Sequence, residues 1–270
     1  DILIIDPKEE EENDRKNKYA KVYWEQRKRR GVTYYSAQRL MRERNYFAAM
    51  MVNEGDADAL ISGYSRNYPT VVKPMLELIG MANGVSKVAT TNLMMTKRGP
   101  LFLSDTSINI DPDAKSLAKI TQMTSNVIKM FGLKPVLAMV SYSNFGSSEH
   151  EKASKIREAV SILHRRHPDM DVDGELQTDF ALNDEMLRER FPFSKLVGKK
   201  VNALIFPNLD SANITYKLLK ELNEADSIGP IMMGMRKPVH ILQLGASVDE
   251  IVNMSAIAVI DAQHKEKWEL

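Results

Sequence analysis

The sequence predicts an α/β protein with a largely parallel sheet. Short apolar runs typical of buried strands alternate along the chain with amphipathic stretches long enough for helices. The clearest unit lies near the end, where the apolar run from Val239 to Leu242 leads into a turn at Gly245 and a helix capped by Ser247. Glu250 follows at the spacing of a capping box. No internal repeat or low-complexity segment interrupts the alternation.

The composition argues against several classes of protein. The 270 residues allow one large domain or two smaller ones, and 43% hydrophobic residues are enough for a sizeable core. Lysine and arginine total 37 against 36 acidic residues, so we expect no nucleic-acid or membrane partner. No cysteine, signal peptide or membrane-spanning apolar stretch is visible, and we expect a cytoplasmic protein.

The first quarter of the chain is expected to be mainly helical. The charged stretch from Asp6 to Arg30 has an apolar side at helical spacing, and Gly31 ends it. Two further helices and a short strand are expected at residues 36–44, 46–53 and 57–61. The apolar residues Ile2 to Ile5 at the very start have the pattern of a strand, which suggests a piece of a longer protein.

The middle of the chain alternates between strands and helices. Strands are expected at residues 88–95, 101–104, 136–141, 202–207 and 228–231. A long amphipathic helix begins with Asp111-Pro112-Asp113-Ala114 and is ended by Gly132 and Pro135. Asp105, Asn109 and Asp111 look like metal ligands, but acids in a loop before a helix are more often caps, and no histidine or cysteine accompanies them. The five histidines are scattered, and we interpret them all as structural or surface residues.

The loop from Ser143 to Ser148 is a candidate anion site. It follows an expected strand and precedes an expected helix. Backbone N–H groups of a glycine- and serine-containing turn at a helix N-terminus can hold a phosphate or a carbonyl oxygen. The pattern is less specific than a P-loop, because no lysine follows Gly146. Neither a GxGxxG nor a Walker motif is present, so the sequence carries no nucleotide-binding fingerprint.

Several of these segments resemble the phosphotransacetylase (phosphate acetyl/butyryl transferase) family. The resemblance rests on Lys237-Pro238-Val239, Gly245, Ser247, Ile251-Val252-Asn253, the loop from Ser143 to Ser148 and the turn from Asn208 to Asn213. It covers most of the chain, from about Tyr46 to Gln263. The pattern is similar to the C-terminal phosphotransacetylase-like domain of the large bacterial NADP-dependent malic enzymes.

The sequence departs from the family pattern at the positions that carry its chemistry. Gln243 stands where the family has a serine, Leu244 where it has an arginine, and Glu250 where it has an aspartate. Lys73 replaces an arginine before a proline and lacks the bidentate fork that suits a phosphate. Arg66, on the preceding turn, could partly stand in for that arginine.

The resemblance implies an architecture. It implies two α/β lobes with an interlobe cleft, as in the isocitrate and isopropylmalate dehydrogenase-like folds. The first lobe would comprise residues 1–84 and 231–270, truncated at its N-terminus, and the second residues 85–230. It also implies at least a homodimer, formed through the middle segment.

The resemblance also implies a ligand and a reaction. Family members bring CoA and acetyl phosphate together in the cleft, where the arginine and serine stabilise developing charge. With Leu244 and Gln243 in their place, we expect a catalytically silent domain that binds acetyl-CoA as a regulatory ligand. The expected ligand-binding residues are Lys73, Arg66, Ser143, Asn144, Gly146, Ser147, Asn208, Asn213, Gln243, Gly245 and Ser247, with Gln243, Leu244 and Glu250 as degenerate catalytic positions.

The parent enzyme and two alternatives complete the hypothesis. The parent would convert malate to pyruvate, with NADP and a divalent metal bound in a domain outside this chain, and no cofactor or metal is expected here. One alternative is an active phosphate acetyltransferase that uses the altered motif. The other is an architectural oligomerisation module.

Overall fold

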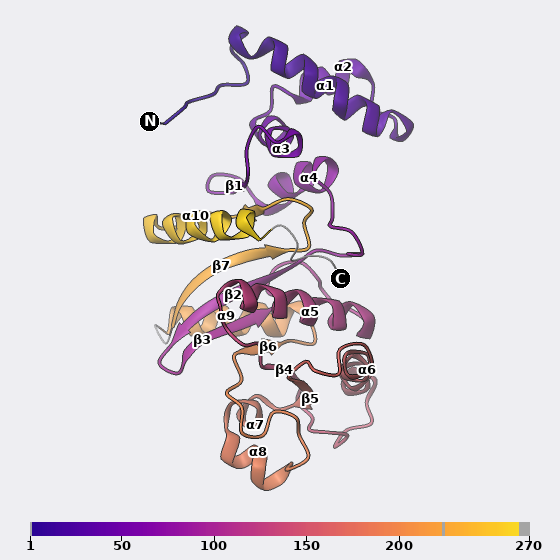
Figure 1. Ribbon diagram of the computed structural model, residues 1–270, viewed down its shortest axis with the longest axis vertical. Helices are drawn as coiled ribbons and strands as arrows, with labels where there is room; N and C mark the ends of the chain where they lie inside the picture. The colour runs from indigo at the N-terminus through magenta and orange to yellow at the C-terminus, as the bar shows by residue number, and fades with distance from the viewer. Residues whose placement is uncertain (1, 223–224, 265–270) are drawn as a thin grey trace.

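The computed structural model describes residues 2–222 and 225–264, within which two sheets of very different size organise the helices (Figure 1). The small sheet pairs β1 (Leu60–Ser62) with β8 (Val239–Ile241) in parallel. The large sheet of the described residues contains β2 (Ala89–Thr96), β3 (Gly99–Ser104), β4 (Leu137–Val140), β5 (Val172–Leu176), β6 (Ala203–Ile205) and β7 (Ala225–Met233). Their order is β5-β4-β6-β3-β2-β7.

Most strand pairs are parallel. Strands β3, β6, β4 and β5 run in one direction, while β2 is antiparallel to both of its neighbours, β3 and β7. The tight turn between β2 and β3 makes that pair a hairpin, which forces the antiparallel arrangement. The predicted α/β class with largely parallel sheets is therefore confirmed.

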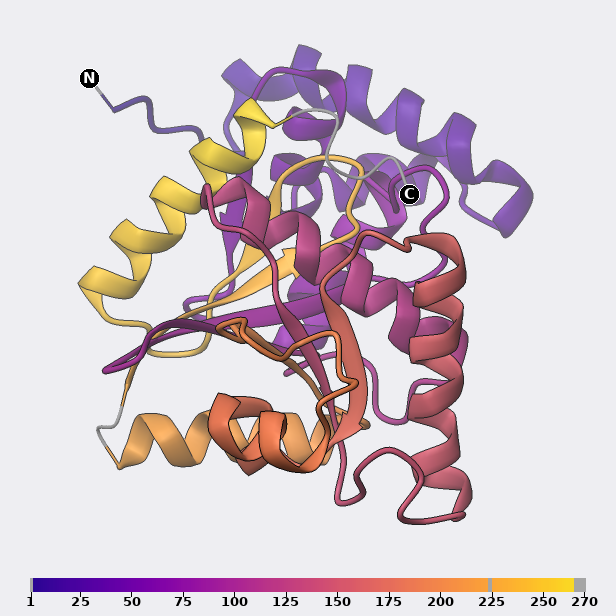
Figure 2. The same ribbon diagram turned by 60° about the horizontal axis from the view of Figure 1, so that its bottom comes forward.

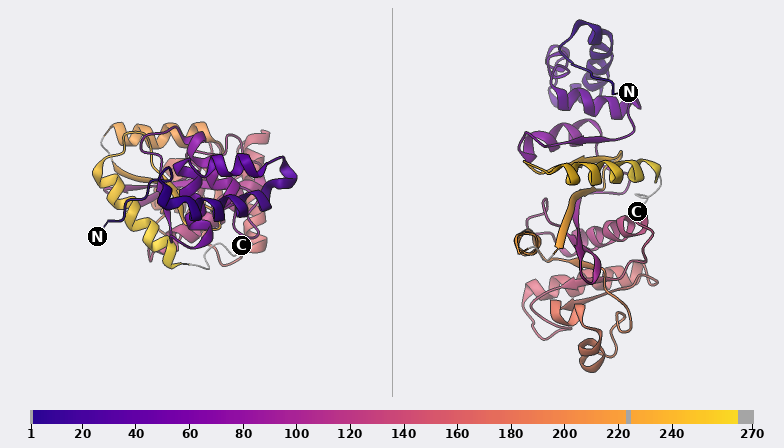
Figure 3. Two further views of the ribbon diagram at one scale, coloured as in Figure 1. Left: turned by 90° about the horizontal axis from the view of Figure 1, so that it is seen from above. Right: turned by 90° about the vertical axis from the view of Figure 1, so that its left-hand side faces the viewer.

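The N-terminal helices form one end of an elongated molecule (Figures 1 and 3). They are η1 (Glu10–Glu12), α1 (Asn13–Arg27), η2 (Lys28–Arg30), α2 (Tyr34–Leu40), α3 (Arg44–Glu54) and α4 (Tyr68–Leu78). Tyr19 and Tyr23 of α1 are buried, as the apolar side of that helix predicts. Gly31 and Gly55 end η2 and α3 with φ of +84°, a left-handed conformation that glycine adopts without strain.

Helices cover both faces of the large sheet (Figure 2). They are α5 (Ala114–Met130), α6 (Glu151–Arg166), α7 (Thr178–Leu182), α8 (Asp184–Arg190) and α9 (Leu209–Glu221). Helices α5 and α6 pack in one apolar cluster, while α7, α8 and α9 pack in another on the opposite face. Asp113 caps α5 by accepting from the Ser116 N–H, so the predicted start of this helix is confirmed.

The last strand and helix contact both parts of the molecule. Val239 and Ile241 of β8 pack with the N-terminal helices, whereas Met254 and Ile257 of α10 (Val248–Gln263) belong to the cluster under α5 and α6. Strand β7 continues through Pro230, where we placed a lobe boundary, and pairs with β2 on both sides of it. The division into lobes at residues 84 and 230 stays a prediction.

Two local expectations were wrong or incomplete. Residues 2–5 form no strand, and Ile2, Leu3 and Ile4 are largely exposed, because no neighbouring strand pairs with them among the described residues. Helix α4 was not foreseen, although Asn67 caps it and Pro69 stands in its first turn, the positions that both residues favour. No helix of the described residues is both long and apolar enough to cross a membrane.

Candidate functional site

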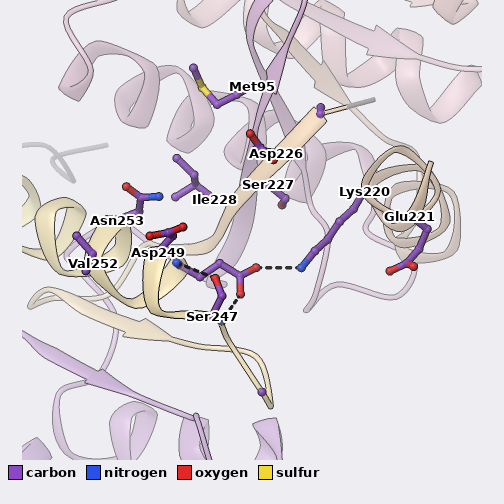
Figure 4. A pocket seen from close by; sticks show the side chains of 13 residues that line it. Met95, Lys220, Glu221, Asp226, Ser227, Ile228, Ser247, Asp249, Val252 and Asn253 are labelled. Atoms are coloured by element: carbon purple, nitrogen blue, oxygen red, sulfur yellow. Dashed lines mark hydrogen bonds and ion pairs between the residues drawn. The ribbon is translucent and has the colours of Figure 1, made fainter. Parts of the chain in front are cut away.

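A cavity of about 940 Å³ lies between the turn before α10, the C-terminal end of α9 and the first half of β7 (Figure 4). Gly245, Ser247 and Glu250 line it from the turn and α10. Lys220 lines it from α9, and Ser227 lines it from β7. The volume is at the upper end of the range for small-molecule sites, which is about 300–1,000 Å³. The segment that we expected to bear a ligand therefore borders a cavity large enough for one.

Glu250 is held by two elements at once. Its Oε2 accepts from the Ser247 N–H at 2.8 Å, and its own N–H donates to the Ser247 Oγ at 3.1 Å, so the predicted capping box is confirmed. Its Oε1 accepts from the Lys220 Nζ at 2.9 Å (Figure 4). Burial raises the pKa of Glu250, but the hydrogen bonds from Lys220 and Ser247 outweigh it and leave the pKa below its usual value. Glu250 is thus a charged structural link rather than a free base.

The turn before α10 is joined to α9 a second time. The Gln243 Nε2 donates to the Tyr216 hydroxyl at 2.8 Å. Tyr216 and Lys220 are four residues apart and therefore lie on one face of α9, where successive turns present neighbouring side chains. Leu244, between these contacts, is 64% exposed and offers no polar group. Gln243 and Glu250 therefore both contact the same face of α9, and residue 244 between them carries no positive charge.

The charge of the cavity lining is mainly negative. Glu221, Asp226, Asp249 and Glu250 face one cation, Lys220, among the described lining residues. A phosphate placed inside this lining would meet repulsion from carboxylates that only one ammonium offsets. The cavity therefore suits a neutral or weakly polar part of a ligand better than an anionic part.

The loop from Ser143 to Ser148 does not line this cavity and surrounds a carboxylate instead. Glu175, fully buried at the end of β5, accepts from the Ser143 Oγ at 2.8 Å, the Gly146 N–H at 3.0 Å and the Arg157 Nη1 at 2.6 Å. The Ser147 Oγ accepts from the Asn144 N–H at 3.0 Å, which closes the turn. Donors that we expected to hold a ligand anion already hold an anion of the protein, so a ligand role for this loop stays a prediction.

The remaining predicted ligand residues are dispersed. Arg66 lies on the turn whose Tyr64 carbonyl accepts from the Gly245 N–H, but it pairs with Glu43 at 3.4 Å. Lys73 is exposed on α4 and does not line the cavity.

The two asparagines of the α9 turn have structural partners. Asn208 caps α9 by accepting from the Ser211 N–H at 3.0 Å, and the Asn213 Nδ2 donates to the Thr106 carbonyl at 3.0 Å. Of the predicted ligand residues, the structure brings Gly245 and Ser247 to the cavity and Gln243 beside it.

The acids of the 105–111 loop act as structural acceptors. Asp105 is buried and accepts from the backbone N–H groups of Thr90 and Asn109 at 3.0 and 2.8 Å. Asp111 pairs with the Lys155 Nζ at 2.5 Å. No group of three or more histidine, cysteine or acidic side chains suited to a metal ion occurs in the part of the chain that the structure describes.

One histidine has a partner that sequence spacing does not reveal. His240 of β8 is completely buried, and its Nε2 lies 3.1 Å from Asp261 Oδ2 on α10. The two residues are distant in sequence, and only the packing of α10 against β8 brings them together. This pair agrees with a structural role for His240.

Sequence reasoning missed the residues that hydrogen-bond to the predicted site residues. Lys220 and Tyr216 carried a usable signal, because their spacing places both on one face of the expected helix together with Asn213. Glu175 and Arg157 carried none, since they come from different elements and meet only through packing of α6 against β5.

Comparison with known proteins links the chain to two kinds of enzyme. Residues 1–259 match the phosphate acetyl/butaryl transferase family. An NADP-dependent malic enzyme of Escherichia coli is 39% identical over 255 residues, which are 94% of this chain and 34% of that protein. A phosphate acetyltransferase of Thermoanaerobacterium thermosaccharolyticum is 37% identical over 267 residues, 96% of this chain and 80% of that protein.

Solved structures show the same relationship. The EutD phosphotransacetylase from Staphylococcus aureus superposes with a TM-score of 0.86 at 30% identity and covers 98% of this chain and 79% of its own. A phosphotransacetylase from Streptococcus pyogenes superposes with a TM-score of 0.84 at 33% identity, covering 96% and 77%. The chain spans only about a third of the length of the malic enzymes that it matches.

Proposed function

The chain belongs to the phosphate acetyl/butaryl transferase family, and we propose that it is the phosphotransacetylase-like domain of an NADP-dependent malic enzyme. In this proposal the domain binds acetyl-CoA as a regulatory ligand and does not make it from acetyl phosphate. The parent enzyme would oxidise and decarboxylate malate with NADP and a divalent metal bound in another part of the protein. Malic enzymes that are 39% identical over nearly all of this chain support that assignment.

The state of Glu250 is the observation that carries the claim of catalytic silence. A general base must be able to take a proton from the substrate thiol. Glu250 is instead charged and bonded to both Ser247 and Lys220, and its low pKa makes it a weak base. The Gln243 side chain is hydrogen-bonded to Tyr216, and the apolar side chain of Leu244 cannot stabilise negative charge that develops in the transition state. Losing one such electrostatic donor typically costs about 2.7–4 kcal/mol of barrier.

The charge of the lining suggests how acetyl-CoA would sit. The acyl and pantetheine parts carry no charge, and we propose that they enter the cavity between Lys220 and Gly245. The phosphates would stay outside the carboxylate-rich lining, towards Arg66 on the turn beside Gly245. Binding and catalysis use different contacts, so a pocket can keep its ligand after losing groups that act only in the transition state.

The test uses full-length protein with CoA and acetyl phosphate at high enzyme concentration, together with a calorimetric titration of acetyl-CoA. We expect acetyl-CoA to bind and thioester formation to stay far below about one turnover per second, the lower end of ordinary enzymes. The double substitution Gln243→Ser with Leu244→Arg should recover a trace of transferase activity. Val259→Arg, which adds the same charge at an exposed position of α10, should not.

The two alternatives give different results. Turnover of about one per second or faster would make the protein an active phosphate acetyltransferase and end the claim of silence. Absence of acetyl-CoA binding to the full-length protein would leave an architectural module.

We also propose that the domain forms at least a homodimer. Ile214 and Leu218 of α9 and Leu222, the residue directly after this helix, follow one another at four-residue spacing and are 64%, 55% and 61% exposed. An apolar stripe of this kind on an exposed helix is typical of an interaction surface. Light scattering should give twice the monomer mass, and a monomer at high concentration would count against the proposal.

A further inference from the structure

A second cavity, of about 360 Å³, lies between the N-terminal half of α5 and the C-terminal end of α6. These helices pack side by side on one face of the large sheet (Figure 2). The cavity shares no lining residue with the one beside Glu250. It therefore belongs to neither the chemistry nor the ligand proposed above.

Positive charge predominates in the lining of this cavity. Lys87, Lys115, Lys119 and Arg166 line it, and Asp113 is its one carboxylate among the described lining residues. Asp113 is occupied as the cap of α5, where it accepts from the backbone. Within residues 2–222 and 225–264, none of the four cations forms an ion pair. The whole chain carries a formal net charge of only +1, so this excess is local.

Two of the four cations, Lys119 and Arg166, repel each other and the neighbouring His167. Burial, and then the charge of Arg166, lowers the pKa of Lys119. Burial also lowers the pKa of the neighbouring His167, with further contributions from Lys119, Arg166 and Lys129. Asp113 offsets part of the charge of Lys87 and Lys115, but Lys119 and Arg166 repel each other, and a bound anion would relieve that repulsion.

Helix electrostatics explains only part of the cluster. Arg166 stands in the last turn of α6, where a cation interacts favourably with the helix dipole. Lys115 stands in the first turn of α5, at the positive end of that dipole, where a cation is unfavourable. An anion between the two helices would interact favourably with Lys115, with the N-terminus of α5 and with Arg166.

We propose that the cavity between α5 and α6 binds a small anion carrying a diphosphate group through Lys87, Lys115, Lys119 and Arg166. Four cations against one engaged carboxylate match the several negative charges of a diphosphate better than those of a single phosphate. The volume corresponds to about twelve water molecules at roughly 30 Å³ each, enough for a diphosphate and part of its substituent. The guanidinium of Arg166 adds the bidentate geometry that phosphate oxygens accept.

The test is a calorimetric titration of the full-length protein at low ionic strength. Inorganic pyrophosphate and ADP are the probes, because they present the same group free and as a nucleoside diphosphate. Orthophosphate and citrate are the comparison anions. We expect pyrophosphate or ADP to bind with a dissociation constant below about 1 mM and at least tenfold more tightly than orthophosphate or citrate. The stronger of the two probes identifies the source of the diphosphate.

Two double variants that remove equal charge distinguish binding in this cavity from a general effect of the protein's net charge. Lys119→Ala with Arg166→Ala removes two cations from the cavity, whereas Lys21→Ala with Arg29→Ala removes two exposed cations near the N-terminal end. We expect the first pair to weaken binding at least tenfold and the second pair to change it less than twofold. Thermal unfolding checks that both variants are folded.

Equal weakening by the two pairs, equal binding of citrate and pyrophosphate, or no binding of either probe below 1 mM would overturn the proposal. The result does not depend on acetyl-CoA, because the residues involved lie outside the cavity proposed for it.

Discussion

Removing the hydroxyl of Ser247 should loosen α10 specifically. The Ser247 Oγ accepts from the Glu250 N–H at 3.1 Å, and Ser247→Ala leaves that N–H without its partner in the first turn. Replacing a serine N-cap by alanine costs about 1 kcal/mol. Since Ser247 itself is exposed, little packing is lost, and the cap accounts for most of the change.

Ser255 supplies the matched control in the same helix. It is also exposed, but its Oγ donates to the Ile251 carbonyl inside the helix instead of capping an end. Ser255→Ala should be neutral or stabilise by up to about 0.5 kcal/mol, because alanine is the better helix former. The two substitutions delete the same hydroxyl oxygen, one at the cap of α10 and one within it, and only Ser247→Ala should destabilise.

Hydrogen exchange of the α10 amides measures the difference directly. A loss of about 1 kcal/mol corresponds to about a fivefold faster local opening. The midpoint temperature of thermal unfolding should fall by about 2–4 °C in Ser247→Ala, as expected for a domain of this size. Equal effects of the two substitutions, or unchanged exchange in Ser247→Ala, would refute the assignment of the cap.

Three further outcomes follow from the structure. Gly63→Ala should lower the free energy of unfolding by about 3 kcal/mol, because φ is +114° and a Cβ would lie 2.4 Å from the Leu242 carbonyl oxygen. The control is Gly132→Ala, where nothing lies within 4 Å of the added Cβ, and it should cost about 1 kcal/mol in a denaturant titration. Tyr46→Phe should cost about 1 kcal/mol in the same titration by deleting the 2.8 Å hydrogen bond to Glu77, and a neutral result would contradict that bond. Glu250→Gln should lower the free energy of unfolding at neutral pH, where the depressed pKa keeps the native carboxylate charged. The difference from wild type should shrink as pH falls below the ordinary carboxyl pKa of about 4.5 and disappear only below the lower pKa of the native carboxyl. A pH-independent difference would show that the charge of Glu250 is not what stabilises the link.

Local features of the fold could be predicted from the sequence. The capping box of Ser247 and Glu250 and the glycine ends at Gly31 and Gly55 all depend on atoms within four residues of one another. Alternating apolar runs likewise predicted the α/β class, because the periodicity of apolar residues that marks a strand or a helix is visible within a few consecutive residues. The resemblance to a family of known fold added the chemistry expected at Gln243 and Leu244.

Long-range contacts decided what the candidate site is. Glu250 meets Lys220, Gln243 meets Tyr216, and Glu175 sits inside the loop from Ser143 because separate helices and strands pack together. The sequence alone predicted the cap between Ser247 and Glu250 and a candidate anion site in the loop from Ser143 to Ser148, but not the partners that reach them from other elements. Tertiary structure shows both engaged, since burying a polar group stabilises a fold only when another group satisfies it, and the partner comes from whichever element packs there. Local hydrogen bonds are determined by sequence, whereas the charge and availability of a site depend on elements that the chain brings together from a distance.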